Sequence, residues 1–283
     1  MYDMPVLTSI APLGPTAEVW FLDIWGVLHG GFKPFASAVA ACIAFRKSGG
    51  HVILVSNSPR PRGGVIAQLN GIGVDPFAYD DVITSGDVSR RLIAEVAGRL
   101  ALHIGPPRDL PLFDGLGVKL TDADRAETIF CTGLYDDECE TPLNYADQLQ
   151  RLHARGVDMI CANPDIKAER GGKIIYCAGA IAQAYERLGG KVRYAGKPYA
   201  PIYDAALDIA ARLRGGTVEK ARVLAIGDGI VTDIRGASNF GVRSVYIASA
   251  VNLTRSTPLS EAAEALFANE PVKPIAVMTA LAW

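Results

Sequence analysis

The stretch Val19–Leu28, with the sequence VWFLDIWGVL, decides how the rest of the chain is interpreted. Its apolar first residues lead into Asp23, and Gly26 follows three positions later. An apolar run that ends in a carboxylate and a turn signal predicts a buried parallel strand with Asp23 at its carboxyl end. Open α/β sheets bind their ligands at that edge. The alternative is that Asp23 caps a turn or the next helix, where aspartate is common.

The composition is that of a globular protein with a substantial core. The chain has 283 residues, of which 49% are hydrophobic, and it carries 30 acidic side chains against 28 basic ones. This length suits one large domain or two modest ones. The balanced charge gives no electrostatic reason to expect nucleic acid or a membrane surface as a partner.

The cysteines and the amino-terminal residues predict a cytoplasmic location. The five cysteines are scattered without a C-x-x-C pair, which favours reduced thiols. The first residues show no basic segment followed by an apolar run, so we expect no secretory signal. No apolar run is long enough to cross a bilayer.

Strand and helix patterns alternate along the chain. After the strand that ends at Asp23, strands are expected over residues 51–55, 82–86, 128–131, 157–161, 173–176, 191–194, 222–226 and 243–248. Helices are expected over residues 35–48, 60–71, 87–100, 142–154, 178–188, 201–213 and from Thr232 or Asp233 to 241. Residues 105–117, rich in proline and glycine, are expected to form a solvent-facing loop.

This order predicts an α/β protein with a Rossmann-like parallel-sheet core and a large inserted α/β cap domain. The core would be made from both ends of the chain, residues 1–83 and 194–283. The cap domain would be residues 84–193.

Three of the predicted core strands end in polar residues: Asp23, Ser56 with Asn57, and Asp228. Parallel strands carry their carboxyl ends at one edge, so these residues can meet there. Two carboxylates held close would repel each other, and a hard divalent cation such as Mg²⁺ removes that repulsion. Mg²⁺ also accepts substrate phosphate as a ligand.

Other side chains at these positions suit phosphoryl chemistry. Ser56 offers a hydroxyl donor and Lys197 a cation, and both can contact phosphoryl oxygens. Asp23 could attack phosphorus, because carboxylates are known to form aspartyl-phosphate intermediates. The alternatives are that Ser56 is a turn hydroxyl, Lys197 a solvated surface side chain, Asp228 a turn residue and Asp233 a helix cap.

Four segments in this order look like the motifs of the haloacid dehalogenase-like superfamily, and the resemblance covers about residues 19–248. The segments are Asp23–Leu28, Leu54–Ser58, Gly196–Pro198 and Ile226–Ile234. More narrowly, the chain resembles subclass IIA, the p-nitrophenyl phosphatase-like and predicted sugar phosphatases, which carry a large α/β cap between the second and third motifs. Two further segments fit that subclass: Ile83–Gly86 at the expected hinge and Ala162–Asp165 in the cap.

The resemblance implies a role for each matching residue. Asp23 would be the nucleophile and a metal ligand, joined by the backbone carbonyl of Trp25. Asp228 would bind Mg²⁺, with Asp233 as a ligand or as a partner behind it.

Ser56 would hydrogen-bond the transferring phosphoryl group, and Lys197 would offset its charge. Asn57, Asn163 and Asp165 would lie where the family selects its substrates.

One position departs from the family pattern. Family phosphatases carry a second aspartate two residues after the nucleophile, and this chain has Trp25 there. An indole N–H donates a hydrogen bond but does not shuttle a proton near neutral pH. His29 is the nearest titratable substitute and is a candidate for substrate contact. The alternative is that His29 is a loop residue without a special role.

The sequence therefore predicts a Mg²⁺-dependent phosphatase of small phosphorylated metabolites, either sugar phosphates or aryl phosphate esters. The alternative is a phospho-ligand-binding or regulatory protein of the same fold with weak or no hydrolysis, because Trp25 replaces the general acid and base. An unrelated nucleotide-binding module is disfavoured because no G-x-G-x-x-G follows the first strand. Assembly as a homodimer is also considered, since caps with an exposed apolar face often dimerise.

Overall fold

A computed structural model describes residues 4–170, 173–248 and 258–283 of the chain. The chain packs as two compact units. The core unit consists of Met1–Ser56, Val65–Ile83 and Pro198–Trp283, and the inserted unit of Asn57–Gly64 and Thr84–Lys197. The two units are described separately below.

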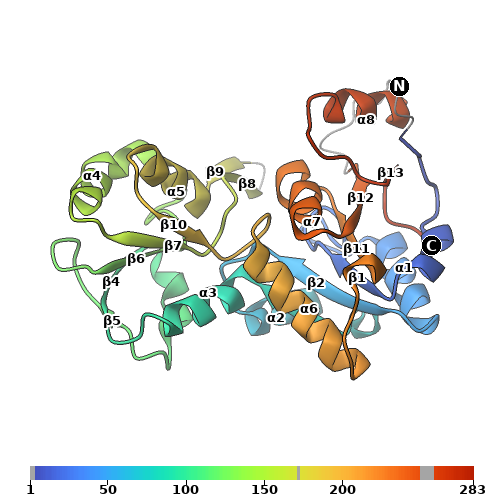
Figure 1. Cartoon of the computed structure of the whole chain (residues 1–283), viewed down its shortest axis with the longest axis horizontal. Helices are drawn as coiled ribbons and strands as arrows, with labels where there is room; N and C mark the ends of the chain where they lie inside the picture. Colours follow the sequence, from blue (N-terminus) through green and yellow to red (C-terminus); the bar gives the residue numbers. More distant parts are fainter. Residues whose placement is uncertain (1–3, 171–172, 249–257) are drawn as a thin grey trace. The chain divides into compact units, whose positions relative to one another are not determined.

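The core unit is built on a six-stranded sheet with the order β13-β12-β11-β1-β2-β3 (Figure 1). These strands are β1 (Val19–Leu22), β2 (His51–Ser56), β3 (Asp81–Thr84), β11 (Val223–Gly227), β12 (Arg243–Ile247) and β13 (Ala276–Met278). Strand β1 pairs in parallel with β2 on one side and β11 on the other. The central strand therefore comes from the stretch that begins at Val19.

Strand β1 is apolar throughout because both of its faces are covered. On one face the indole of Trp20 stacks on Phe45 of helix α1 (Ala36–Lys47), with ring centroids 4.0 Å apart. On the other face Phe21 meets Tyr203 of helix α6 (Ala200–Arg214). Helices on both faces of the sheet leave its carboxyl edge as the place where polar residues emerge.

The remaining helices of the chain are short. They are α2 (Arg62–Gly71), α3 (Ser85–Ala94), α4 (Ala146–Ala154), α5 (Ala178–Arg187), α7 (Arg235–Phe240) and α8 (Leu259–Phe267). Five 3-10 segments accompany them: Ala11–Thr16, Pro76–Ala78, Pro107–Phe113, Pro142–Tyr145 and Lys220–Arg222.

The inserted unit has its own parallel sheet, with the order β10-β7-β6-β4-β5 (green and yellow in Figure 1). Its strands are β4 (Leu100–Ile104), β5 (Lys119–Leu120), β6 (Thr128–Cys131), β7 (Asp158–Cys161) and β10 (Val192–Tyr194). Strands β8 (Lys167–Arg170) and β9 (Lys173–Tyr176) form a separate antiparallel pair. Helices α4 and α5 contribute to a core shared with this sheet.

The units divide the chain differently from the expected domains at two places. Asn57–Gly64 packs with the inserted unit, and that unit continues to Lys197 instead of ending at residue 193. Hydrogen bonds give the reason, because the backbone N–H of Gly86 donates to the carbonyl of Ser58 and Asn57 bonds to the backbone of Lys197.

Two predictions about the inserted unit are wrong. The helix expected over residues 87–100 ends at Ala94, and Leu100 begins strand β4. The expected solvent-facing loop contains a 3-10 segment, Pro107–Phe113, with Leu112 and Phe113 buried. Its apolar side chains pack inward, so proline content alone did not indicate exposure.

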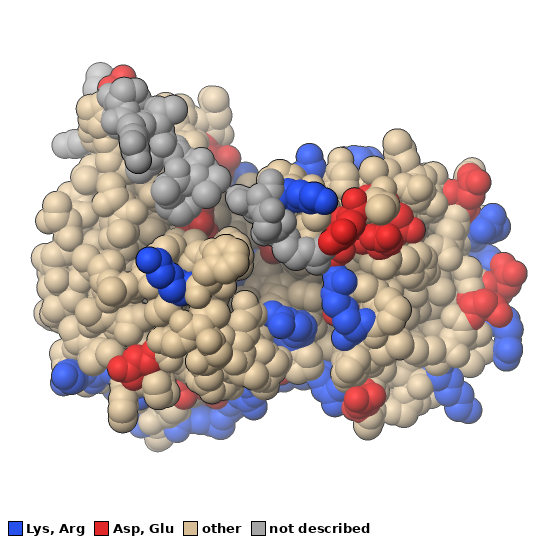
Figure 2. Space-filling model, turned by 180° about the vertical axis from the view of Figure 1, so that it is seen from behind, with Lys and Arg blue, Asp and Glu red and all other residues tan. Residues whose placement is uncertain are grey.

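Among the described residues, no helix combines the length and the apolar composition that crossing a bilayer requires. On the face shown in Figure 2, basic and acidic residues are interspersed on a surface that consists largely of other residues. This distribution agrees with the balanced charge of the sequence.

Candidate functional site

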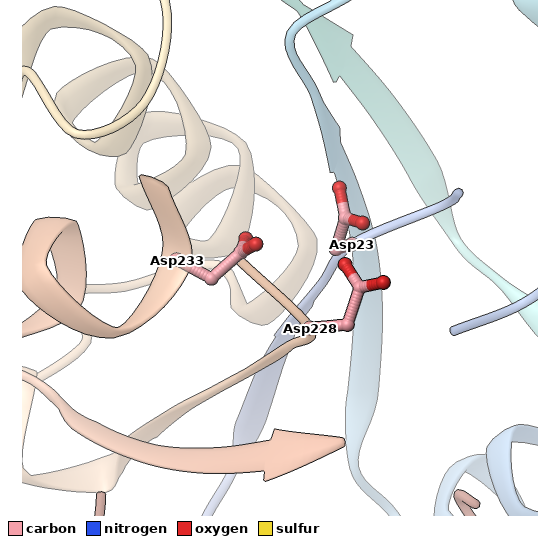
Figure 3. A group of neighbouring side chains, drawn as sticks. All are labelled: Asp23, Asp228 and Asp233. Atoms are coloured by element: carbon pink, nitrogen blue, oxygen red, sulfur yellow. The ribbon is translucent and has the colours of Figure 1, made fainter. Parts of the chain in front are cut away.

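Three aspartates converge at the carboxyl edge of the core sheet. Leu22 of β1 is paired with Ile226 of β11, and the backbone N–H of Asp23 extends this ladder by donating to the carbonyl of Ile226 at 2.8 Å. Asp23 and Asp228 therefore leave neighbouring strands together. One carboxylate oxygen from each of Asp23, Asp228 and Asp233 lies within 4.8 Å of the other two (Figure 3).

Asp233 reaches the cluster from a π-helical turn, Ile230–Ile234, which precedes α7. Its Oδ2 accepts hydrogen bonds from the backbone N–H of Gly229 at 3.1 Å and from the Thr232 hydroxyl at 3.3 Å. A Cβ at Gly227 would lie 2.2 Å from the carboxyl carbon of Asp233, so this glycine makes room for the buried carboxylate. The helix expected to start at Thr232 or Asp233 instead begins at Arg235, after the turn that holds Asp233.

Gly26 makes room for Asp228. It has a φ of +78°, and a Cβ there would lie 2.0 Å from Oδ2 of Asp228. The backbone N–H of Gly26 donates to the carbonyl of His29, which closes the loop after Asp23. The Trp25 carbonyl belongs to the peptide joined to Gly26, so the backbone here lies close to the Asp228 carboxylate.

Ser56 lies at the same edge of the sheet. It is the last residue of β2, which pairs with β1 in the register Leu22 to Leu54. The order β11-β1-β2 thus confirms that the strands bearing Asp228, Asp23 and Ser56 are neighbours.

Trp25 points its ring outward, with 50% of the residue exposed. The indole meets the imidazole of His29 edge-on, with centroids 5.4 Å apart, and covers Gly31, where a Cβ would lie 2.9 Å from the ring. The ring is therefore held by its own loop.

His29 is buried, with 2% of the residue exposed, and burial lowers the pKa of its imidazole. Its Nδ1 accepts a hydrogen bond from the backbone N–H of Gly31 at 2.9 Å. A neutral, buried ring with this bond does not present itself to a substrate. The structure thus argues against substrate contact by His29 and favours its alternative as a loop residue.

The other predicted residues belong to the inserted unit. Asn57, Asn163, Asp165 and Lys197 all lie there. The side chain of Asn57 contacts both Asp165 and the backbone of Lys197. Asn163 accepts from the backbone N–H of Asp165. These four residues are therefore connected to one another within that unit.

The donor set of the aspartate cluster fits Mg²⁺. It consists only of carboxylate oxygens, which are the ligands that hard cations prefer. Three carboxylates in so small a space also repel one another, and a cation removes that repulsion. Asp233, whose Oδ2 is held by Gly229 and Thr232, can serve as a direct ligand or as the partner of a bound water.

Two contributors to the cluster were not singled out from the sequence. Thr232 supports the carboxylate of Asp233, and Gly26 admits that of Asp228. The glycines at 26, 227 and 229 beside the acids were the available signal, because glycine commonly marks a close backbone approach.

Comparisons with known proteins agree on one family. A model described as haloacid dehalogenase-like hydrolase matches residues 20–119, and one described as HAD-hydrolase-like matches residues 194–271. A search of curated protein sequences finds no match.

Several solved structures are similar over nearly their whole length. A hydrolase of the haloacid dehalogenase-like family from Brucella suis 1330 is 45% identical, with a TM-score of 0.85 over 98% of this chain and 100% of that chain. A "possible sugar phosphatase" from Cytophaga hutchinsonii is 20% identical, with a TM-score of 0.78 over 98% of both chains. A p-nitrophenyl phosphatase from Archaeoglobus fulgidus is 23% identical, with a TM-score of 0.74 over 94% of this chain and 97% of that chain. The last two show the fold alone.

Proposed function

The chain belongs to the haloacid dehalogenase-like hydrolase family, in subclass IIA, and from this premise we propose that it is a Mg²⁺-dependent phosphatase of small phosphorylated metabolites. The observation that carries the proposal is the convergence of Asp23, Asp228 and Asp233 at the carboxyl edge of the core sheet. Aryl esters and sugar phosphates are the substrate classes to test first. The names of two similar structures, a p-nitrophenyl phosphatase and a "possible sugar phosphatase", support this choice.

Asp23 is the proposed nucleophile. A carboxylate oxygen of Asp23 attacks phosphorus, the bond from phosphorus to the ester oxygen breaks, and an aspartyl phosphate forms. Water then attacks phosphorus in that intermediate, which releases orthophosphate and regenerates the carboxylate. Ser56 donates a hydrogen bond to a phosphoryl oxygen, and Lys197 offsets the negative charge of the group.

Mg²⁺ would be held by Asp23, Asp228 and the backbone carbonyl of Trp25, with Asp233 as a ligand or behind the ligands. When bound, the cation supplies positive charge against the phosphoryl oxygens and the clustered carboxylates. Gly26 and Gly227 allow the carboxylates to approach this position, and Thr232 fixes the carboxylate of Asp233.

A phospho-ligand-binding or regulatory protein is the second candidate, and Trp25 is the observation that favours it. General acid–base assistance contributes about 10²–10⁴-fold to a rate. The indole of Trp25 does not supply it, and the imidazole of His29 is buried. Loss of this assistance slows both the departure of the ester oxygen and the attack of water, but it leaves phosphate binding intact.

Turnover of p-nitrophenyl phosphate with Mg²⁺ separates the two candidates. Native chain, Asp23→Asn and Trp25→Asp are compared, and orthophosphate binding to each is measured by calorimetry. Turnover by the native chain that Asp23→Asn abolishes supports the phosphatase. If only Trp25→Asp turns over, the natural chain is a binder. Turnover that survives in Asp23→Asn contradicts the assignment of the nucleophile.

We also propose a cytoplasmic location and assembly as a homodimer. The five free cysteines, four of them buried, support a reducing compartment. Light scattering of the purified chain measures the mass in solution and so tests the dimer.

A further inference from the structure

Asn57 holds the peptide groups on both sides of the Lys197 Cα. Its Oδ1 accepts from the backbone N–H of Lys197 at 2.7 Å, and its Nδ2 donates to the backbone carbonyl of the same residue at 3.0 Å. Both residues are buried, so a broken bond here would not be replaced freely by water. This pair of bonds fixes the backbone of Lys197 and hence the direction in which its side chain leaves the chain.

Asp165 fixes the orientation of the Asn57 amide. The Nδ2 of Asn57 also donates to Oδ1 of Asp165 at 2.9 Å. A rotated amide would place its oxygen against this carboxylate and against the carbonyl of Lys197, and both contacts would be repulsive. With both N–H groups bonded within the protein, the Asn57 amide acts as a clamp for the backbone.

Asp165 is itself anchored. Its backbone N–H donates to Oδ1 of Asn163 at 3.0 Å, and its carbonyl accepts from the N–H of Gly179 at 3.1 Å. Asn163 and Lys197 follow the neighbouring parallel strands β7 and β10, where Cys161 is paired with Tyr194. The carboxyl ends of these strands therefore bring the two segments together.

Gly196 allows the clamp to close. A Cβ at this position would lie 2.4 Å from Oδ1 of Asn57, 2.7 Å from Oγ of Ser85 and 2.8 Å from Cδ of Pro164. Only a residue without a side chain lets the Asn57 amide reach the next peptide. This contact explains the glycine that precedes Lys197.

We propose that Asn57 and Asp165, with Asn163 behind them, are positioning residues that hold Lys197 in its working direction. This inference rests on the proposed function, in which Lys197 offsets the charge of the phosphoryl group. It replaces substrate contact as the predicted role of these three residues. Because Asn57 directly follows Ser56, the clamp also joins the segment bearing Lys197 to the segment bearing the phosphoryl-binding hydroxyl.

A double-mutant cycle tests whether Asn57 acts through Lys197. Asn57→Ala, Lys197→Ala and the double variant are compared by kcat and KM for p-nitrophenyl phosphate. Loss of the clamp removes two buried hydrogen bonds, and we expect Asn57→Ala to lower kcat about tenfold or more. In the Lys197→Ala background the same substitution should change kcat less than twofold, because nothing remains to be positioned. Equal losses in both backgrounds would overturn the proposal.

The conservative variant of Asp165 separates positioning from substrate binding. Asp165→Asn keeps an oxygen that can accept from Asn57, whereas Asp165→Ala does not. We expect Asp165→Asn to retain kcat within about threefold and Asp165→Ala to approach Asn57→Ala, because the hydrogen bond rather than the charge is needed. A large rise in KM for Asp165→Asn, as large as for Asp165→Ala, would instead assign the carboxylate to the substrate.

Asn144→Ala is the matched control. Asn144 also lies in the inserted unit, and its side chain accepts from the backbone N–H of Thr141 at 2.9 Å. Its removal should lower thermal stability slightly and leave kcat unchanged. Thermal unfolding of every variant identifies any that has failed to fold.

Orthophosphate binding distinguishes failure of this inference from failure of the proposed function. If the native chain does not hydrolyse esters, the phosphatase proposal fails. The same cycle is then read as orthophosphate affinity, where the Asn57→Ala effect should again depend on Lys197. A native chain that neither hydrolyses esters nor binds orthophosphate contradicts both.

Discussion

The Cα of Gly26 lies against the carboxylate of Asp228, and this contact shapes the candidate metal site at the residue scale. Gly26 meets two demands at once. Its φ of +78° disfavours residues with a side chain, and its surroundings leave no room for a Cβ. The second demand concerns the site alone, because the atom in the way is an oxygen of the proposed ligand Asp228.

Gly26→Ala should weaken Mg²⁺ binding by about tenfold or more, because the added methyl group displaces the Asp228 carboxylate. Calorimetric titration with Mg²⁺ measures this change. Gly49→Ala is the control, since Gly49 has a φ of +94° with nothing within 4 Å of a Cβ. Backbone strain should lower the stability of both variants, whereas only Gly26→Ala should lose affinity. Equal Mg²⁺ affinity in the two variants would count against the site.

Trp25→Asp restores a carboxylic acid at the position where family phosphatases carry one. We expect turnover to rise, by up to about 10²–10⁴-fold for an alkyl phosphate. The gain should be smaller for p-nitrophenyl phosphate, because nitrophenolate leaves without a proton. The half-exposed indole makes the substitution tolerable for the fold. Steady-state kinetics with the two esters check this order, and no gain with either ester would mean that another group already supplies the proton.

At the element scale, agreement with the sequence followed the strength of the local pattern. Strands β6 and β9 have the expected bounds, because each is a short apolar run between polar residues. Strand β4 was missed because its first residue continued the helical pattern of α3 across Gly98. Strand β13 and helix α8 were also not anticipated.

The site shows the same limit. That Asp23 and Asp228 would meet follows from parallel strands sharing one edge. The clamp between Asn57 and Lys197 joins residues 140 positions apart, and its hydrogen bonds depend on how the 57–64 segment folds back, which no local pattern encodes. Sequence reasoning therefore named the right residues but assigned some of them roles that only their contacts reveal.

Strand β4 also carries a pH-dependent contribution to stability. Burial lowers the pKa of His103 to about 4, and its Nε2 lies 2.9 Å from the hydroxyl of Thr132. The unfolded histidine titrates near 6.5, so between that pH and about 4 the unfolded chain binds more protons. The folded state should therefore lose stability as the pH falls through this window.

Urea unfolding of native chain and His103→Gln at pH 7 and pH 5 measures the effect. The loss of stability on acidification should be larger for the native chain, since glutamine keeps a hydrogen-bond donor but does not titrate. Asp109, whose pKa is raised by burial, is present in both chains and cancels in the comparison. His153→Gln serves as a control in the same unit. Identical pH dependence of native chain and His103→Gln would contradict this assignment.

At the scale of the whole molecule, the proposed metal site and the proposed clamp belong to different units. The core unit contains Asp23, Asp228 and Asp233, and the inserted unit contains Asn57, Asp165 and Lys197. Each unit has its own parallel sheet and its own buried core. Binding of a metal to the aspartates should therefore stabilise one unit directly.

The three tryptophans allow this to be measured. Trp20, Trp25 and Trp283 all belong to the core unit, so tryptophan fluorescence reports on its unfolding alone. At a Mg²⁺ concentration of about 100 times Kd, binding adds about 2.7 kcal/mol, and the fluorescence midpoint should rise by roughly 5–10 °C. Circular dichroism follows both units and should show a smaller average shift.

Asp228→Asn provides the decisive comparison for this prediction. Removing one of three mutually repelling carboxylates should raise the metal-free midpoint of the core unit, and removing a ligand should abolish the response to Mg²⁺. The two effects have opposite signs, so a variant that is merely damaged cannot produce both. If Asp228→Asn keeps the full Mg²⁺ response, the cation binds elsewhere, and the convergence of the three aspartates does not explain the chemistry proposed for this chain.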